Sequence, residues 1–151
     1  MIPEGTGPEN FKGFSESANL AMLRCHAIAQ ESGADSATDL HLLFGLMSNI
    51  QILNAFRKTN LDFEKIFTPE NLGLTPGAQR REVVPVDQTV NDVLAEAGKV
   101  AAERKLRRIT AELLALICVK SSPNCRALLA LDPEQEALLE SEIEKALADP
   151  S

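Results

Sequence analysis

Few side chains in this sequence of 151 residues have the types and spacing that chemistry requires. The two histidines are His26 and His41, and the three cysteines are Cys25, Cys118 and Cys125. Because Cys25 and His26 are adjacent, on a helix they would point to different faces and could not share one metal ion. No Cys-x-x-Cys pair occurs. We therefore expect no metal site.

A catalytic site would need His41 in a cleft with Asp39 or Glu112 as its acid or base. The block around His41 is apolar, however, which favours a structural histidine that hydrogen-bonds to the backbone. The sequence motifs of phosphate-binding loops, zinc proteases and serine hydrolases do not occur. We expect a protein that is not an enzyme and uses no cofactor.

Charge is unevenly distributed along the chain. Four cations lie within the five positions 104–108, and the candidate anion-binding residues among them are Arg104, Arg107 and Arg108. Seven acids against one base fill the stretch 132–149. Both runs are also typical of a solvated surface. The formal net charge of −7 argues against general nucleic-acid binding.

The elements that must position these residues repeat after 72 positions. Two apolar stripes have the three-and-four spacing of a helix with one buried face. The first stripe is Ala18, Ala21, Met22, Cys25, Ile28 and Ala29, and the second is Val90, Val93, Leu94, Ala97, Val100 and Ala101. A further apolar block follows each stripe, at 40–46 and 112–118. This duplication predicts an all-α, pseudo-twofold fold whose grooves favour binding over catalysis.

We expect about eight helices, in a duplicated repeat of four helices each. Repeat one spans 14–67. Its first predicted helix is capped by Ser15 and runs to about 31, and its second is capped by Thr38 or Asp39 and runs to about 48. The third and fourth predicted helices cover about 52–58 and about 62–67. Repeat two spans 86–148. Its first predicted helix runs from the Asp87 cap to about 105, and its second runs from the Thr110 cap to about 120. The third covers about 123–131, and the fourth runs from the Asp132 cap to the end of the repeat. The hydroxyl and carboxylate caps can accept hydrogen bonds from the unpaired amides of a first turn. In the last helix the predicted buried face is Ala137, Leu138, Ile143, Ala146 and Leu147.

Glycine and proline mark the segments outside the repeats. They predict a flexible N-terminal arm at residues 1–13 and a linker at residues 68–85. Around the end of the linker, Val83, Val84 and Val86 favour a brief extended segment. The start of the chain has no basic, apolar leader, and its longest apolar run, 113–119, is far short of the ~20 residues that cross a membrane. Three cysteines, an odd number, favour reduced thiols and a cytoplasmic protein.

The beginning of repeat one, Phe14-Ser15-Glu16-Ser17-Ala18, and its block Asp39-Leu40-His41-Leu42-Leu43-Phe44-Gly45-Leu46 resemble the first repeat of the Clp amino-terminal domain. That domain precedes the ATPase rings of Clp/Hsp100 unfoldases. The second block, 110–116, keeps the family's glutamate as Glu112 but lacks its histidine and glycine. The resemblance covers about 14–147. It implies a double Clp amino-terminal motif without ATPase modules, which binds adaptors, substrates or a Clp-type unfoldase in protein quality control.

In some members of that family the domain recognises phosphorylated arginine at two symmetric sites. A hydroxyl at each repeat start and a glutamate in each block contribute there. Here Ser15 and Glu112 remain, whereas Asp87 and Leu40 replace the other two residues. Because Asp87 would repel a phosphate and Leu40 cannot pair with a guanidinium, we do not expect phosphoarginine binding. The candidate partner-binding residues are Ser15, Leu40, Asp87, Glu112, Arg104, Arg107 and Arg108.

Two functions follow from the residues and from the resemblance. The first is a non-catalytic protein-interaction domain, with polypeptide partners and neither nucleic acid nor membrane among its targets. The alternative is a sensor of a small ligand or anion, such as a phosphorylated compound, that uses the basic cluster at 104–108.

Overall fold

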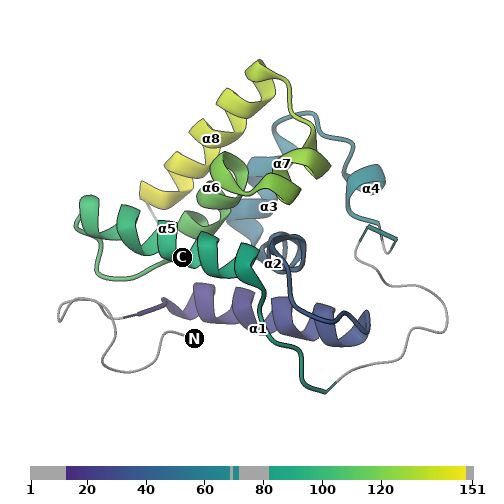
Figure 1. The fold of residues 1–151 in the computed structure, drawn as a ribbon. Helices are drawn as coiled ribbons and strands as arrows, with labels where there is room; N and C mark the ends of the chain where they lie inside the picture. The colour runs from purple at the N-terminus through teal and green to yellow at the C-terminus, as the bar shows by residue number, and fades with distance from the viewer. Residues whose placement is uncertain (1–12, 69, 72–81, 149–151) are drawn as a thin grey trace.

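The structure, a computed structural model, describes residues 13–68, 70–71 and 82–148. Across these residues the chain is all-α, and its helices are α1 (Glu16–Glu31), α2 (Asp39–Leu46), α3 (Ile50–Arg57), α4 (Phe63–Ile66), α5 (Gln88–Glu103), α6 (Ala111–Ser121), α7 (Pro123–Leu129) and α8 (Pro133–Ala148) (Figure 1). Nearly all of the expected arm at 1–13 and most of the expected linker at 68–85 lie outside the described residues.

The 72-residue repeat is visible in how the long helices begin. The side chains of Ser15 and Asp87 cap α1 and α5 by accepting hydrogen bonds from first-turn amides. Thr110 caps α6 in the same way. At the start of α2 the ring of His41 accepts a hydrogen bond from the amide of Thr38, at 2.9 Å. The structure thus confirms these helix starts and the interpretation of His41 as a histidine bonded to the backbone.

Two short pairings of extended backbone join the repeats to each other. Phe14 pairs with Ile109 and Ala37 pairs with Val86, and each partner of one pair lies 72 positions from a partner of the other. The hydrogen bonds of the two pairs also correspond, since Ser15 donates to Ile109 as Asp87 donates to Ala37, at 2.9 and 3.0 Å. The first seam is residues 13–17 against 109–111, and the second seam is residues 85–89 against 37–39. Their equivalence establishes the predicted approximate twofold.

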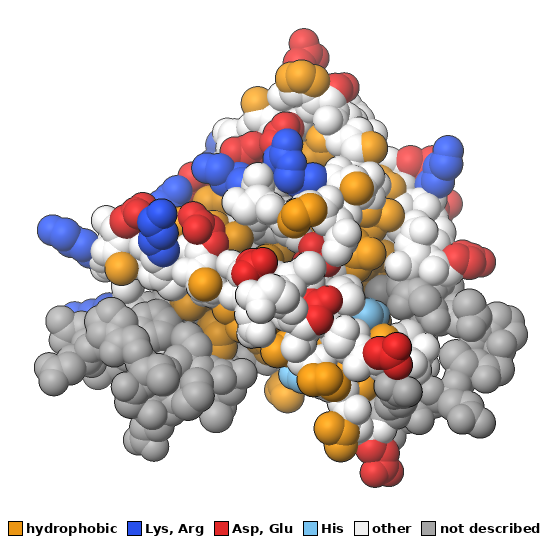
Figure 2. All heavy atoms as spheres, viewed as in Figure 1, with side chains coloured by type: hydrophobic (Ala, Val, Ile, Leu, Met, Phe, Trp, Pro, Cys, Tyr) orange, Lys and Arg blue, Asp and Glu red, His pale blue; other side chains and the backbone are white. Residues whose placement is uncertain are grey.

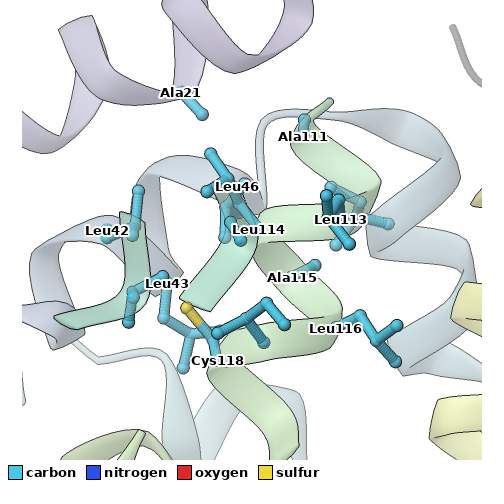
Figure 3. Packing of buried hydrophobic residues seen from close by; sticks show 14 of the residues in the cluster. Ala21, Leu42, Leu43, Leu46, Ala111, Leu113, Leu114, Ala115, Leu116 and Cys118 are labelled. Atoms are coloured by element: carbon cyan, nitrogen blue, oxygen red, sulfur yellow. The ribbon is translucent and has the colours of Figure 1, made fainter. Parts of the chain in front are cut away.

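Helices α2 and α6 form the centre of the molecule. Both are buried almost all round, α6 without interruption from Ala111 to Val119, as expected of helices that other helices surround. Figure 3 shows leucines of α2, among them Leu42 and Leu46, and leucines of α6, among them Leu114, in one shared cluster with Ala21 of α1. Leu42 and Leu114 are equivalent positions of the two repeats.

The two repeats differ in how their first two helices pack. A Cβ on Gly45 of α2 would lie 2.8 Å from the carbonyl oxygen of Ala21 and 3.0 Å from the amide nitrogen of Cys25. Since both are backbone atoms of α1, the packing of α1 on α2 requires glycine here. The equivalent residue in α6 is Ile117. Helices α5 and α6 pack less closely than α1 and α2.

Helix α8 covers α3 and α6 through Leu139, Ile143 and Leu147. Ile143 and Leu147 were predicted to be buried, but Ala137 and Leu138 are exposed. The prediction was wrong there because the core-facing row runs in steps of four from Leu139, which turns Leu138 by about 100° away from the core.

Four acidic residues of α8 pair with cations of four other segments, so much of the acidic stretch serves contacts within the domain. The ion pairs are Lys58–Glu142, Arg104–Glu144, Lys120–Glu140 and Arg126–Glu136.

Helix α3 begins two residues earlier than predicted, because the side chain of Asn49 caps it by accepting hydrogen bonds from two first-turn amides. No described helix has the length and continuous apolar character that crossing a membrane requires.

Candidate functional site

The first seam brings Ser15 and Glu112 to the same region, although they belong to different repeats. The hydroxyl of Ser17 accepts a hydrogen bond from the amide of Ala111, at 3.3 Å, directly before Glu112. The Ser15 oxygen lies 2.9 Å from the Ser17 oxygen and also caps α1. Glu112 is fully buried. Both candidate residues are therefore buried at this seam, where Ser15 caps a helix, and neither is presented to solvent.

The second seam holds a buried polar network around Asp39. The amide of Asp39 donates to the hydroxyl of Thr89, at 3.0 Å, and that hydroxyl donates to the carboxylate of Asp87. The carboxylate of Asp39, fully buried, accepts hydrogen bonds from the hydroxyl of Ser122 and, at 2.9 Å, from the amide group of Asn124. A buried carboxylate needs such donors to offset its lost hydration. The network fixes α2, α5 and the start of α7 relative to one another.

A cavity of about 180 Å³, open to solvent, lies beside this network. It is formed between α5 and the α6–α7 turn and is lined by Thr89, Asp92, Val93, Ile117, Ser121, Ser122 and Pro123. Val93 and Ile117 contribute apolar surface, and the hydroxyls of Thr89, Ser121 and Ser122 can hydrogen-bond to a ligand. An apolar cavity of about 150 Å³ accepts a benzene-sized molecule. This one has room for one large apolar side chain.

The three cysteines are free and buried, as expected. Burial raises the pKa of the Cys25 thiol to about 12, and the nearby charge of Asp87 adds to the effect. A hydrogen bond with Cys125, together with burial, raises the pKa of Cys118 well above its ordinary value. Thiolate chemistry at Cys25 and Cys118 is thus disfavoured near neutral pH. No cluster of potential metal ligands occurs among the described residues.

The structure does not leave the basic cluster wholly available to a ligand. The guanidinium of Arg104 binds both carboxylate oxygens of Glu144, at 2.7 and 3.0 Å. This hydrogen bonding raises the pKa of Arg104 and lowers the pKa of Glu144. Arg107 and Arg108 are exposed in the segment before α6. Leu40 follows Asp39 of the second seam in α2, and its side chain is half-buried against the core.

Comparison with known proteins decides the family of this chain. The family model of the Clp repeat (R) N-terminal domain matches residues 13–130, most of the chain.

This protein belongs to the Clp N-terminal domain family.

Solved structures share the fold of this Clp N-terminal domain. The Hsp104 N-terminal domain from Candida albicans superposes with a TM-score of 0.74 at 12% identity, over 92% of this chain and 94% of that one. The N-terminal domain of the chaperone ClpD from Arabidopsis thaliana gives 0.62 at 18% identity, over 95% and 99%. A structure from a malarial protein secretion system gives 0.66 at 19% identity, over 91% and 99%. No curated protein matches the chain in sequence.

Sequence reasoning missed Thr89, Ser122 and Asn124 as parts of this Clp N-terminal domain's polar network. One signal was available, because Thr89 lies 72 positions after Ser17 and keeps its hydroxyl. Ser122 and Asn124 gave no such signal, since only the packing of α7 beside α2 brings them to Asp39.

Proposed function

We propose that this Clp N-terminal domain is a docking module that binds a short segment of a polypeptide, from an adaptor or substrate of a Clp-type unfoldase, in the cavity between α5 and the α6–α7 turn. The observation that carries the proposal is the composition of that cavity. Val93 and Ile117 offer apolar surface for one inserted side chain, and hydroxyls at the rim offer partners for the backbone of an extended segment. The domain itself performs no chemistry.

The surroundings of the cavity also support binding rather than catalysis. The polar network at Asp39 and Thr89 joins three helices and gives the cavity fixed walls. Preformed walls reduce the entropic cost of ordering the site when a ligand binds. Three buried free thiols support a reducing, cytoplasmic location.

A permanently unfolded probe tests the proposal. Reduced, carboxymethylated lactalbumin, labelled with a fluorophore, is titrated with the domain and followed by fluorescence anisotropy. The Ser121→Phe variant places a ring at the exposed rim of the cavity and is expected to weaken binding at least about tenfold, the loss of one well-packed apolar contact.

Ser121→Ala is the matched control, because it removes the hydroxyl and leaves the cavity open. It is expected to bind the probe within about threefold of the wild-type protein. Equal binding by Ser121→Phe and wild type, with both variants folded by circular dichroism, would exclude the cavity as the docking site.

We further propose that the domain does not bind phosphoarginine. Glu112 is fully buried and Ser15 already caps α1, so the first seam presents neither group to a ligand. At the second seam the carboxylate of Asp87 accepts three hydrogen bonds and would repel a phosphate, and Leu40 supplies no charge. Calorimetric titration with free phosphoarginine is expected to give no heat of binding. Micromolar affinity would contradict this.

An anion sensor at the basic cluster is the weaker alternative, because Glu144 already neutralises Arg104. Titration with inorganic phosphate at low salt tests it. Binding that is lost in the Arg107→Ala/Arg108→Ala double variant would favour the sensor, and binding unchanged by that variant would exclude it.

A further inference from the structure

The outer face of α1 carries an apolar stripe that the fold leaves exposed. Leu20 and Leu23 keep 47% and 66% of their surface accessible, and Ala27, one turn on, is also exposed. The spacing of three and four residues places them in one row, opposite the row that faces the core. Hydrophobic side chains reach the surface along the lower edge in Figure 2, where Figure 1 places α1. We call these three residues the α1 face.

The second repeat shows that the fold does not require this face. The equivalent positions on α5 are Asp92, Ala95 and Lys99, all exposed, and Asp92 also lies at the rim of the cavity beside α5. Helices α1 and α5 have the same length, a side-chain cap at the same position and the same place in their repeats. Away from the cavity rim at Asp92, their outer faces therefore meet the same structural demands.

The two outer faces differ at all three positions, and most of all at the two leucines. On α5 an aspartate and an alanine stand at their places, and a lysine replaces the alanine of α1. The α5 row thus has two charges and one methyl group, whereas the α1 face has no charge and two large apolar side chains. The two leucines thus have no apolar counterpart of their size on α5, and the fold forms in the second repeat without them.

The charges beside the α1 face indicate the kind of partner. Glu16 stands one turn before Leu20 and is exposed. At the other end of α1, the side chain of Gln30 donates to the carbonyl of Glu82, which places the exposed Glu82 beside the helix. Arg24 is the cation on the exposed side of the helix. An apolar row between carboxylates is complementary to an apolar row between cations.

We propose that the α1 face docks an amphipathic helix of a partner protein that carries Lys or Arg beside its apolar row. A second copy of this chain is the less favourable occupant, because each copy carries a net charge of −7 and five of its cations already pair with acids of α8. The α1 face is separate from the cavity beside α5, so this proposal goes beyond the docking function proposed above and does not depend on it.

The experiment uses a synthetic amphipathic helix of leucine and lysine, with leucines in steps of three and four, added to the isotope-labelled protein. Amide chemical shifts are expected to change along 16–31, and raising the salt to about 0.5 M is expected to weaken binding severalfold. A peptide with glutamate in place of every lysine is the matched probe and is expected not to bind.

The triple variant Leu20→Asp/Leu23→Ala/Ala27→Lys gives α1 the outer face that α5 carries. Since α5 folds with those residues, the variant is expected to keep the helical spectrum and unfolding midpoint of the wild type and to bind the lysine peptide at least about tenfold more weakly. The cavity variant Ser121→Phe is expected to bind that peptide like the wild type, which separates this proposal from the first.

Three results would each overturn the inference. The triple variant binds the lysine peptide as tightly as the wild type, the glutamate peptide binds equally well, or the shift changes lie at Val93 and Ile117 and not on α1. Sedimentation of the protein alone checks the remaining occupant. A concentration-dependent dimer that the triple variant abolishes would assign the α1 face to a second copy and not to a basic partner.

Discussion

The backbone amide of Asp39 donates a hydrogen bond to the hydroxyl of Thr89, at 3.0 Å, and so joins the first residue of α2 to the first turn of α5. The first seam repeats this relationship, with Ala111 donating to Ser17 at 3.3 Å. First-turn amides have no partner within their own helix. Each repeat thus satisfies an amide at the start of the other repeat's buried helix, and the two halves stabilise each other.

The first prediction follows from that bond. Replacing Thr89 by valine keeps the shape of the side chain but removes the acceptor for Asp39 and the donor to Asp87. The free energy of unfolding is expected to fall by about 1–3 kcal/mol, the cost of leaving polar groups without partners. Urea unfolding followed by circular dichroism measures it. Thr89→Ser, which keeps the hydroxyl, should lose less than half as much, and equal losses would refute the explanation.

The second prediction concerns the ends of α1 and α5. Gly33 and Lys105 are equivalent residues after these helices, and both have left-handed backbone, with φ of 67° and 59°. A side chain costs about 1 kcal/mol in this conformation and glycine does not. Lys105→Gly should therefore raise the free energy of unfolding by about 1 kcal/mol, measured as a higher urea midpoint. Lys105→Ala, which keeps a Cβ, is the control and should show no such gain.

The third prediction compares two helical glycines. Gly45→Ala places a Cβ against the backbone of α1, at 2.8 Å from the oxygen of Ala21, and should destabilise by about 1–3 kcal/mol. Gly98→Ala in α5 meets no atom within 4 Å and should stabilise by about 0.5–1 kcal/mol, because alanine loses less entropy on helix formation. Thermal unfolding distinguishes them, and effects of the same sign would contradict the packing described.

The fourth prediction concerns alkaline pH. In the folded protein, burial raises the pKa of the Cys25 thiol to about 12, whereas in the unfolded chain the thiol ionises near its ordinary pKa of 9.0. Between these values the unfolded state binds fewer protons, so stability falls as pH rises, by up to about 1.4 kcal/mol per pH unit. Urea midpoints from pH 8 to 11 should fall less steeply in Cys25→Ala than in the wild type. Parallel slopes would be inconsistent with a buried, protonated thiol.

The fifth prediction concerns the exposed pair of Arg104 and Glu144. Since the pKa of Glu144 is lowered in the folded state, its contribution to stability is present above the ordinary glutamate pKa and is lost as pH falls through the lowered value. Glu144→Gln is expected to cost less than about 1 kcal/mol at pH 7 and nothing once the wild-type carboxylate is protonated. Denaturant titrations at pH 7 and pH 2.5 test this, and an equal cost at both would exclude the ion pair as its source.

The sequence predicted the helices more reliably than the site. The cap residues Ser15, Asp87 and Thr110 were identified because a cap depends on three or four neighbouring residues of the chain. The buried row of α8 was misplaced at Leu138, since a helix rich in leucine and alanine offers more than one apolar row and the neighbours α3 and α6 select one. Local pattern specifies a helix, and packing specifies its orientation.

The sequence by itself determined that the chain is all-α and built twice, because a 72-residue recurrence of helix-spaced apolar residues and caps is written in one dimension. Tertiary structure alone decided that Ser15 shares a seam with Glu112 and that Asp39 meets Thr89, Ser122 and Asn124. It also decided that Ile117 borders a cavity where its counterpart Gly45 permits close contact. The hydrogen bonds among these relationships join residues 50 to 94 positions apart. Hydrogen bonding and close packing over such separations depend on how the two halves fold onto each other.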